Sequence, residues 1–366
     1  MKTNAELLTE RKERIRKAVA LEKPDRTPLV YMADSFCARH MGVPMADFCS
    51  SLKASSKVML DSTKALGEVD GLDFAFVPAP FFPLGFLTHI KMPGKELPPD
   101  SLWQLDEREL MTVEDYDTIL NKGWRPFEAD FLSKRLGIDL PAIMEEVMGI
   151  PEMVKNFEEA GYVVYSPLVI NLVNEKLSGG RSMPRFIGDL RRCPDKVTAV
   201  LDLIQEDVLQ EVRQQIKATN STYVFISPAR GASEFFSPKL WERFVWKYLK
   251  QIADMIIEEG AVVNFHIDSN WERDLDFFKS FPKGRCVFET DGATDIYKVK
   301  EAIGDQMCIK GDVPAGLLAL GTPDEVHSYC TRLIKDMGPG FILSAGCTIP
   351  ANARIENVKA MIAAVN

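Results

Sequence analysis

The chain has 366 residues, more than a small domain and within the range of a single (β/α)8 barrel. Hydrophobic residues make up 46% of it, enough to bury a large core. A net charge of −9 argues against a nucleic-acid partner, which would need a basic surface. No apolar stretch has the length that spanning a bilayer requires, so no membrane partner is expected. The seven cysteines are spread singly along the chain, which predicts free thiols in a reducing cytoplasm. The first segment is charged and lacks the apolar core of a signal peptide.

Short apolar runs rich in β-branched and aromatic residues predict eight strands. These runs cover residues 28–32, 74–77, 162–170, 223–227, 262–266, 286–289, 307–311 and 341–344. Apolar residues at helical spacing lie between the later runs, and they predict helices over 196–217, 239–259, 295–303 and 324–337. Strands that alternate with helices indicate a parallel sheet, and eight of them close into a barrel.

The segment between the second and third predicted strands breaks this alternation. A Pro/Phe-rich stretch begins it, a hairpin is expected around 91–107, and helices follow. We therefore predict an α/β fold consisting of one (β/α)8 TIM barrel domain over residues 1–366, with an N-terminal helix. Residues 79–160 are expected to form an elaborated insertion over the barrel mouth.

His266 and Cys347 each follow a predicted strand in the last third of the chain. If these strands are neighbours in one parallel sheet, an imidazole and a thiol meet at its carboxyl edge. Asp268 lies two residues beyond His266, on the same side of an extended chain. Each residue alone is commonly structural: a satisfied core histidine, a turn aspartate or a small buried thiol. Together they form a three-ligand set with an open fourth position, which is typical of catalytic zinc.

Further polar residues follow the next predicted strands. Glu289 and Asp291 end one strand and Asp312 ends the next, so all three are possible metal or substrate groups. Cys308 begins its strand and is expected to face the barrel floor or core. An aromatic cluster in the insertion either packs in the core or lines an apolar substrate pocket. Its members are Phe81, Phe82 and Phe86.

Several segments resemble the uroporphyrinogen decarboxylase superfamily, and specifically its corrinoid-dependent methyltransferase branch. The resemblance is carried by residues 23–28, by Gly311-Asp-Val-Pro with 321–326, and by 341–347 with Pro350 and 356–361. It covers nearly the whole chain but is specific only from about residue 223 onward, and residues 79–160 match loosely.

Two departures from the decarboxylases favour the methyltransferase branch. Residues 31–40 offer one arginine, Arg39, where decarboxylases carry an arginine-rich motif that binds substrate carboxylates. Gly346-Cys347 stands where they carry a His-Gly pair. The branch implies zinc bound by this cysteine and by a His-x-Cys on an earlier strand. Here Asp268 replaces the cysteine of that motif, which makes the donor set harder.

The resemblance and the harder donor set together predict the activity. We expect a zinc-dependent methyltransferase that moves a methyl group from a methoxylated aromatic donor to the cobalt of a corrinoid protein, as an O-demethylase component does. Three alternatives stay open: methyl transfer from methylcorrinoid to a thiol or another acceptor, porphyrinogen decarboxylation without a metal, and a non-enzymatic barrel that binds a corrinoid protein or small ligand. Metal analysis separates the methyltransferases from the other two.

Overall fold

The computed structural model describes residues 2–366, in which parallel strands form the walls of a barrel. Six of them make one sheet in the order β11-β10-β9-β8-β7-β6, and three make another in the order β1-β2-β5. Their bounds are β1 (Val30–Tyr31), β2 (Gly71–Leu72), β5 (Val163–Val164), β6 (Leu168–Asn171), β7 (Tyr223–Ser227), β8 (Val262–Ile267), β9 (Cys286–Thr290), β10 (Cys308–Val313) and β11 (Phe341–Ala345).

Two links join the sheets into a ring. At one side, parallel bridges pair Leu29 with Leu343 and Met32 with Thr348, so β1 lies beside β11. At the other side, β5 pairs with β2 and β6 pairs with β7, and only a short stretch of chain separates β5 from β6. With β5 and β6 counted as one interrupted strand, the ring has the eight strands of a TIM barrel, as predicted.

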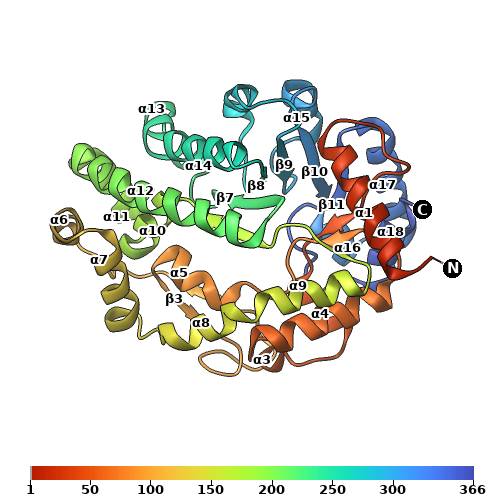
Figure 1. Cartoon of the computed structure of the whole chain (residues 1–366), viewed down its shortest axis with the longest axis horizontal. Helices are drawn as coiled ribbons and strands as arrows, with labels where there is room; N and C mark the ends of the chain where they lie inside the picture. The colour runs from red at the N-terminus through yellow and green to blue at the C-terminus, as the bar shows by residue number, and fades with distance from the viewer. Residues whose placement is uncertain (1) are drawn as a thin grey trace.

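Helices follow the strands and cover the outside of the ring (Figure 1). They are α2 (Asp34–His40), α3 (Met45–Phe48), α4 (Leu52–Leu66), α10 (Val173–Arg181), α11 (Met183–Arg192), α12 (Pro194–Thr219), α13 (Pro238–Trp241), α14 (Lys247–Glu258), α15 (Ile296–Ile303), α16 (Ala315–Leu320), α17 (Pro323–Met337) and α18 (Ile355–Ala363). The predicted helix over 239–259 exists in three pieces, because a π-helical turn over Glu242–Trp246 separates α13 from α14. In residues 2–366, no helix combines the length and apolar character needed to cross a bilayer.

The N-terminal helix α1 (Asn4–Val19) covers one end of the barrel. Its residues Ile15, Ala18 and Val19 share a small buried cluster with Cys308 and with residues that begin other strands. Cys308 therefore lies at the barrel floor, as predicted, and the carboxyl ends of the strands face the opposite, open end.

The insertion between β2 and β5 lies on one side of the ring, where Figure 1 shows its orange and yellow elements. It contains α5 (Phe82–Phe86), the antiparallel pair β3 (His89–Lys91) and β4 (Gln104–Asp106), α6 (Val113–Lys122), α7 (Trp124–Asp130), α8 (Leu140–Met148) and α9 (Ile150–Glu159). The β3–β4 pair is the predicted hairpin. The treatment of residues 1–366 as one domain, with 79–160 as its insertion, stays a prediction.

One predicted strand is misplaced. The run 74–77 is a loop, and the second barrel strand is β2, which ends at Leu72. The run is apolar because its side chains are buried between the barrel and the insertion. The ring centroids of Phe74 and Phe225 lie 5.0 Å apart, and those of Phe76 and Phe81 lie 6.0 Å apart. Burial without strand pairing gives the same sequence pattern as a buried strand.

The closed core predicts a clear contrast between two leucines. Leu343 in β11 is fully buried, whereas Leu320 at the end of α16 is 78% exposed. We expect Leu343→Ala to lower the free energy of unfolding by about 2–5 kcal/mol, because it leaves a cavity. The matched Leu320→Ala should change it by less than about 0.5 kcal/mol. Urea denaturation followed by circular dichroism measures both, and equal midpoints would contradict the packing described here.

Candidate metal centre

Three side chains with metal-binding atoms meet at the open end of the barrel. His266 comes from β8, Asp268 from the segment directly after it, and Cys347 from the segment after β11. The strands β8 and β11 are not neighbours, because β9 and β10 lie between them. The side chains meet without the strands being adjacent, because the closure of the barrel brings the strand ends together.

Two of the distances between the donor atoms match those in a zinc site. Cys347 Sγ lies 3.5 Å from His266 Nε2, which lies 3.5 Å from Oδ1 of Asp268. The three donor atoms all lie within 4.8 Å of one another. Zinc bonds to these donor types have lengths that place tetrahedral ligands about 3.3–3.8 Å apart. His266 is buried, while Asp268 and Cys347 are half-buried, so the cluster is accessible from one side.

The His266 ring is held from two directions. It stacks on the Phe225 ring with centroids 4.9 Å apart, and its Nδ1 lies 3.4 Å from Oε1 of Glu289. Nε2 therefore faces Asp268 and Cys347. Burial alone lowers the pKa of His266, but the charges of Glu289 and Cys347 and the contact with Asp268 raise it well above its usual value. The site thus has a negative potential that favours a cation.

The other predicted polar residues make hydrogen bonds elsewhere. Both Glu289 oxygens are bound, Oε1 by Lys310 at 2.9 Å and Oε2 by Asn264 at 2.9 Å. Asp291 accepts hydrogen bonds from two backbone amides, one in its own loop after β9 and one in the loop after β8. Asp312 accepts one from Tyr329 at 2.7 Å, and burial raises its pKa to about 6. The structure brings none of the three into the cluster, and their roles as metal or substrate groups stay predictions.

Two buried charged residues near the cluster were not identified from the sequence. Lys310 and Asp73 are fully buried, and Lys310 Nζ contacts both Asp73 oxygens at 2.6 Å. A signal for Lys310 existed, because a lysine in the middle of an apolar strand run must find a buried partner. Asp73 gave no comparable signal, since the second strand was placed after it instead of before it.

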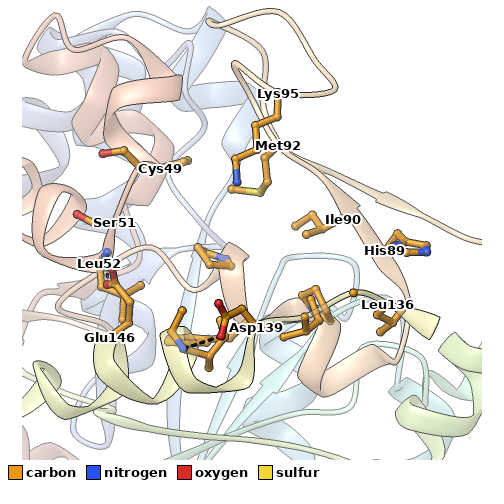
Figure 2. Close-up of a pocket in the computed structure, with 18 of the residues that line it drawn as sticks. Cys49, Ser51, Leu52, His89, Ile90, Met92, Lys95, Leu136, Asp139 and Glu146 are labelled. Atoms are coloured by element: carbon orange, nitrogen blue, oxygen red, sulfur yellow. Dashed lines mark hydrogen bonds between the residues drawn. The ribbon is translucent and has the colours of Figure 1, made fainter. Parts of the chain in front are cut away.

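The aromatic cluster of the insertion is divided between two environments. Phe82 and Phe86 pack edge to face with centroids 5.8 Å apart, and Phe86 is buried. Phe81 lines a cavity of about 510 Å³ between the start of α4, the β3–β4 hairpin and α8. Figure 2 shows Leu52, His89 and other side chains around this cavity. None of His266, Asp268 and Cys347 (the metal cluster of this protein) lines this cavity, so a substrate role for the three phenylalanines stays a prediction.

The sequence of the chain matches a known protein family. A family model for uroporphyrinogen decarboxylase (URO-D) matches residues 174–366, more than half of the chain and all of the metal cluster. The chain belongs to the URO-D family. No curated protein matches the sequence of this URO-D family member.

Solved structures extend the similarity to the whole fold. A methyltransferase from Methanosarcina mazei matches with a TM-score of 0.72 and 17% identity, over 97% of each chain. This similarity extends beyond the residues that the family model covers, and at this identity it concerns the fold. The IolI protein with a bound zinc atom matches with 12% identity over 70% of this chain and 92% of its own; its TM-score of 0.35 is too low to support a comparison.

The geometry predicts that the URO-D family protein, purified without chelators, contains about one zinc per chain, as a single three-ligand site requires. His266→Ala and Cys347→Ala should each lose the metal, because two protein donors hold zinc poorly. Cys308→Ala, at the barrel floor, is the matched control and should keep it. Elemental analysis by mass spectrometry measures the content, and stoichiometric zinc in both cluster variants would contradict the site.

Proposed function

We propose that this URO-D family protein is a zinc-dependent methyltransferase that demethylates a methoxylated aromatic compound and passes the methyl group to the cobalt of a corrinoid carried by a partner protein. The observation that carries the proposal is the cluster of His266, Asp268 and Cys347, with three donor atoms within 4.8 Å of one another and one accessible side. The fold shared with the Methanosarcina mazei methyltransferase supports it.

A porphyrinogen decarboxylase fits these residues less well. Such an enzyme binds several carboxylates, and the resemblance implies an arginine-rich motif in the segment around Arg39. Arg39 instead donates a hydrogen bond to the Asp100 carbonyl at the protein surface, at 2.8 Å. Asp268 places a carboxylate at the mouth of the barrel, which disfavours a polycarboxylate substrate.

The donor set favours an oxygen-containing substrate. Imidazole and carboxylate are harder donors than a second thiolate, so they suit a metal that polarises oxygen. When bound, zinc supplies a Lewis acid for the negative charge that develops on the ether oxygen. The O–CH3 bond of the ether breaks with its electron pair left on oxygen, and the methyl carbon bonds to cobalt(I) of the partner's corrinoid through the cobalt electron pair. The products are a phenolate and methylcobalt(III).

The chain's own residues orient the ether for this transfer. His266, Asp268 and Cys347 lie on one side of the reacting oxygen, so the methyl carbon can point toward the open end of the barrel. A corrinoid is bulky and must approach from that end, because α1 covers the other. We assign the insertion, residues 79–160, to covering the aromatic ring, and we place the protein in the reducing cytoplasm, where cobalt(I) survives.

The proposal predicts methyl transfer that depends on the cluster. Mixing the zinc-loaded protein with a reduced corrinoid protein and a panel of methoxyphenols and methoxybenzoates should produce the methylcobalt absorption change with at least one ether. Cys347→Ala should lower the rate about 100-fold or more, because a Lewis acid contributes several kcal/mol. Cys308→Ala is the control and should react at the wild-type rate.

Other outcomes of the same assay identify the alternatives. If no ether reacts but methylcorrinoid loses its methyl group when a thiol is added, the protein works toward an acceptor. If neither reaction occurs and a porphyrinogen loses carboxylate, the protein is a decarboxylase and the proposal is wrong.

A further inference from the structure

A row of charged and polar side chains begins at His266 of the metal cluster and continues across the inside of the barrel. His266 in β8, Glu289 in β9 and Lys310 in β10 occupy matching positions on adjacent strands. Side chains at matching positions of paired strands point to the same face. Asp73, which follows β2 on the other side of the barrel, completes the row by binding Lys310. Glu289, Lys310 and Asp73 are fully buried.

Glu289 is the member of this row that contacts the metal cluster. Its Oε1 accepts a hydrogen bond from Lys310 Nζ at 2.9 Å and lies 3.4 Å from His266 Nδ1. Its Oε2 accepts a hydrogen bond from Asn264 Nδ2 at 2.9 Å. Two donors thus fix the carboxylate next to the ring nitrogen that faces away from Asp268 and Cys347. Among residues 2–366, His266 Nδ1 has no hydrogen-bond partner, and Oε1 of Glu289 lies 3.4 Å from it.

We propose that Glu289 is a positioning residue that orients His266 for zinc, and that Lys310, Asp73 and Asn264 hold Glu289 in place. The inference rests on the proposed zinc site. A carboxylate that accepts a hydrogen bond from Nδ1–H of a histidine fixes the tautomer of the imidazole. Nε2 is then free to bind the metal, and the hydrogen bond makes Nε2 a stronger donor.

The charges of the row support this role better than a role in folding alone. One ammonium and two carboxylates leave a net charge of −1 beneath His266, which adds to the carboxylate of Asp268 and favours a divalent cation. Buried ion pairs contribute little net stability, because desolvation offsets the attraction. Apolar residues could fill the same space without the desolvation cost, but they could not orient the imidazole.

The affinity for zinc tests the inference. We expect Glu289→Gln to raise the zinc dissociation constant about 10–100-fold, the usual effect of losing an outer partner of a metal ligand. Competition with a chromophoric zinc chelator measures it in the absence of any substrate. Asp189→Asn is the matched control: Asp189 is also a fully buried carboxylate, paired with Arg181 at 2.7 Å, but it lies on α11 and does not contact the cluster. Its zinc affinity should equal that of the wild type.

Two further variants keep the test valid if Glu289→Gln does not fold. Asn264→Ala leaves the buried charges unchanged and removes an Oδ1 that has no hydrogen-bond partner in residues 2–366, so it should fold. It frees the Glu289 carboxylate to rotate and should weaken zinc binding up to about 10-fold. The combined variant Asp73→Leu, Glu289→Leu and Lys310→Met replaces the three buried charges by apolar side chains, which proteins commonly tolerate. It should unfold near the wild-type midpoint yet bind zinc about 10–100-fold more weakly.

The outcomes separate this inference from the proposed function. If the wild-type protein binds zinc and the folded variants bind it equally tightly, Glu289 does not position His266 and the inference is overturned, while the zinc site stands. If wild-type zinc binding is absent or survives both His266→Ala and Cys347→Ala, the proposed site fails and this inference fails with it.

Discussion

The contact between the Lys310 ammonium and the carboxylates of Asp73 and Glu289 constrains the inside of this barrel. Each of these fully buried charges costs several kcal/mol to remove from water, and only close pairing offsets that cost. The three residues come from β10, β9 and the segment after β2, so their pairing fixes the relative positions of elements on opposite sides of the ring. Asn264 adds a fourth attachment from β8. The buried side chains beneath the metal cluster are therefore held rigidly. A three-ligand zinc site needs such support, because its histidine must keep one orientation.

Barrel closure explains why His266 and Cys347 lie close together. In an open sheet, β8 and β11 would be separated by two strands, and His266 could not reach Cys347. In a ring, the strand ends converge, and the two donor atoms lie 3.5 Å apart. Helix α1 fills the opposite end, so ligands can approach only where the cluster is. The same geometry that buries the apolar strands thus concentrates polar side chains at one accessible place.

Much of this arrangement could be predicted from the sequence, and the failures have physical causes. Buried parallel strands are continuous apolar runs, so β7 to β11 were placed within a residue or two. The second strand was misplaced because 74–77 is equally apolar but buries its side chains without pairing. His266, Asp268 and Cys347 could be found because strand ends meet in a barrel. The pairing of Lys310 with Asp73 joins residues 237 positions apart, and no local pattern predicts such a contact.

The donor set and its support together favour one type of chemistry. Asp268 replaces the thiolate that the methyltransferase branch implies, and Glu289 lies beside the imidazole on the side away from the metal cluster. An imidazole nitrogen and a carboxylate oxygen are both harder donors than a thiolate, so Cys347 supplies the one soft donor among the three. A metal held in this way keeps more positive charge than one bound by two thiolates, and it interacts more strongly with an ether or phenolate oxygen than with sulfur. This is why demethylation of an ether fits these residues better than methylation of a thiol.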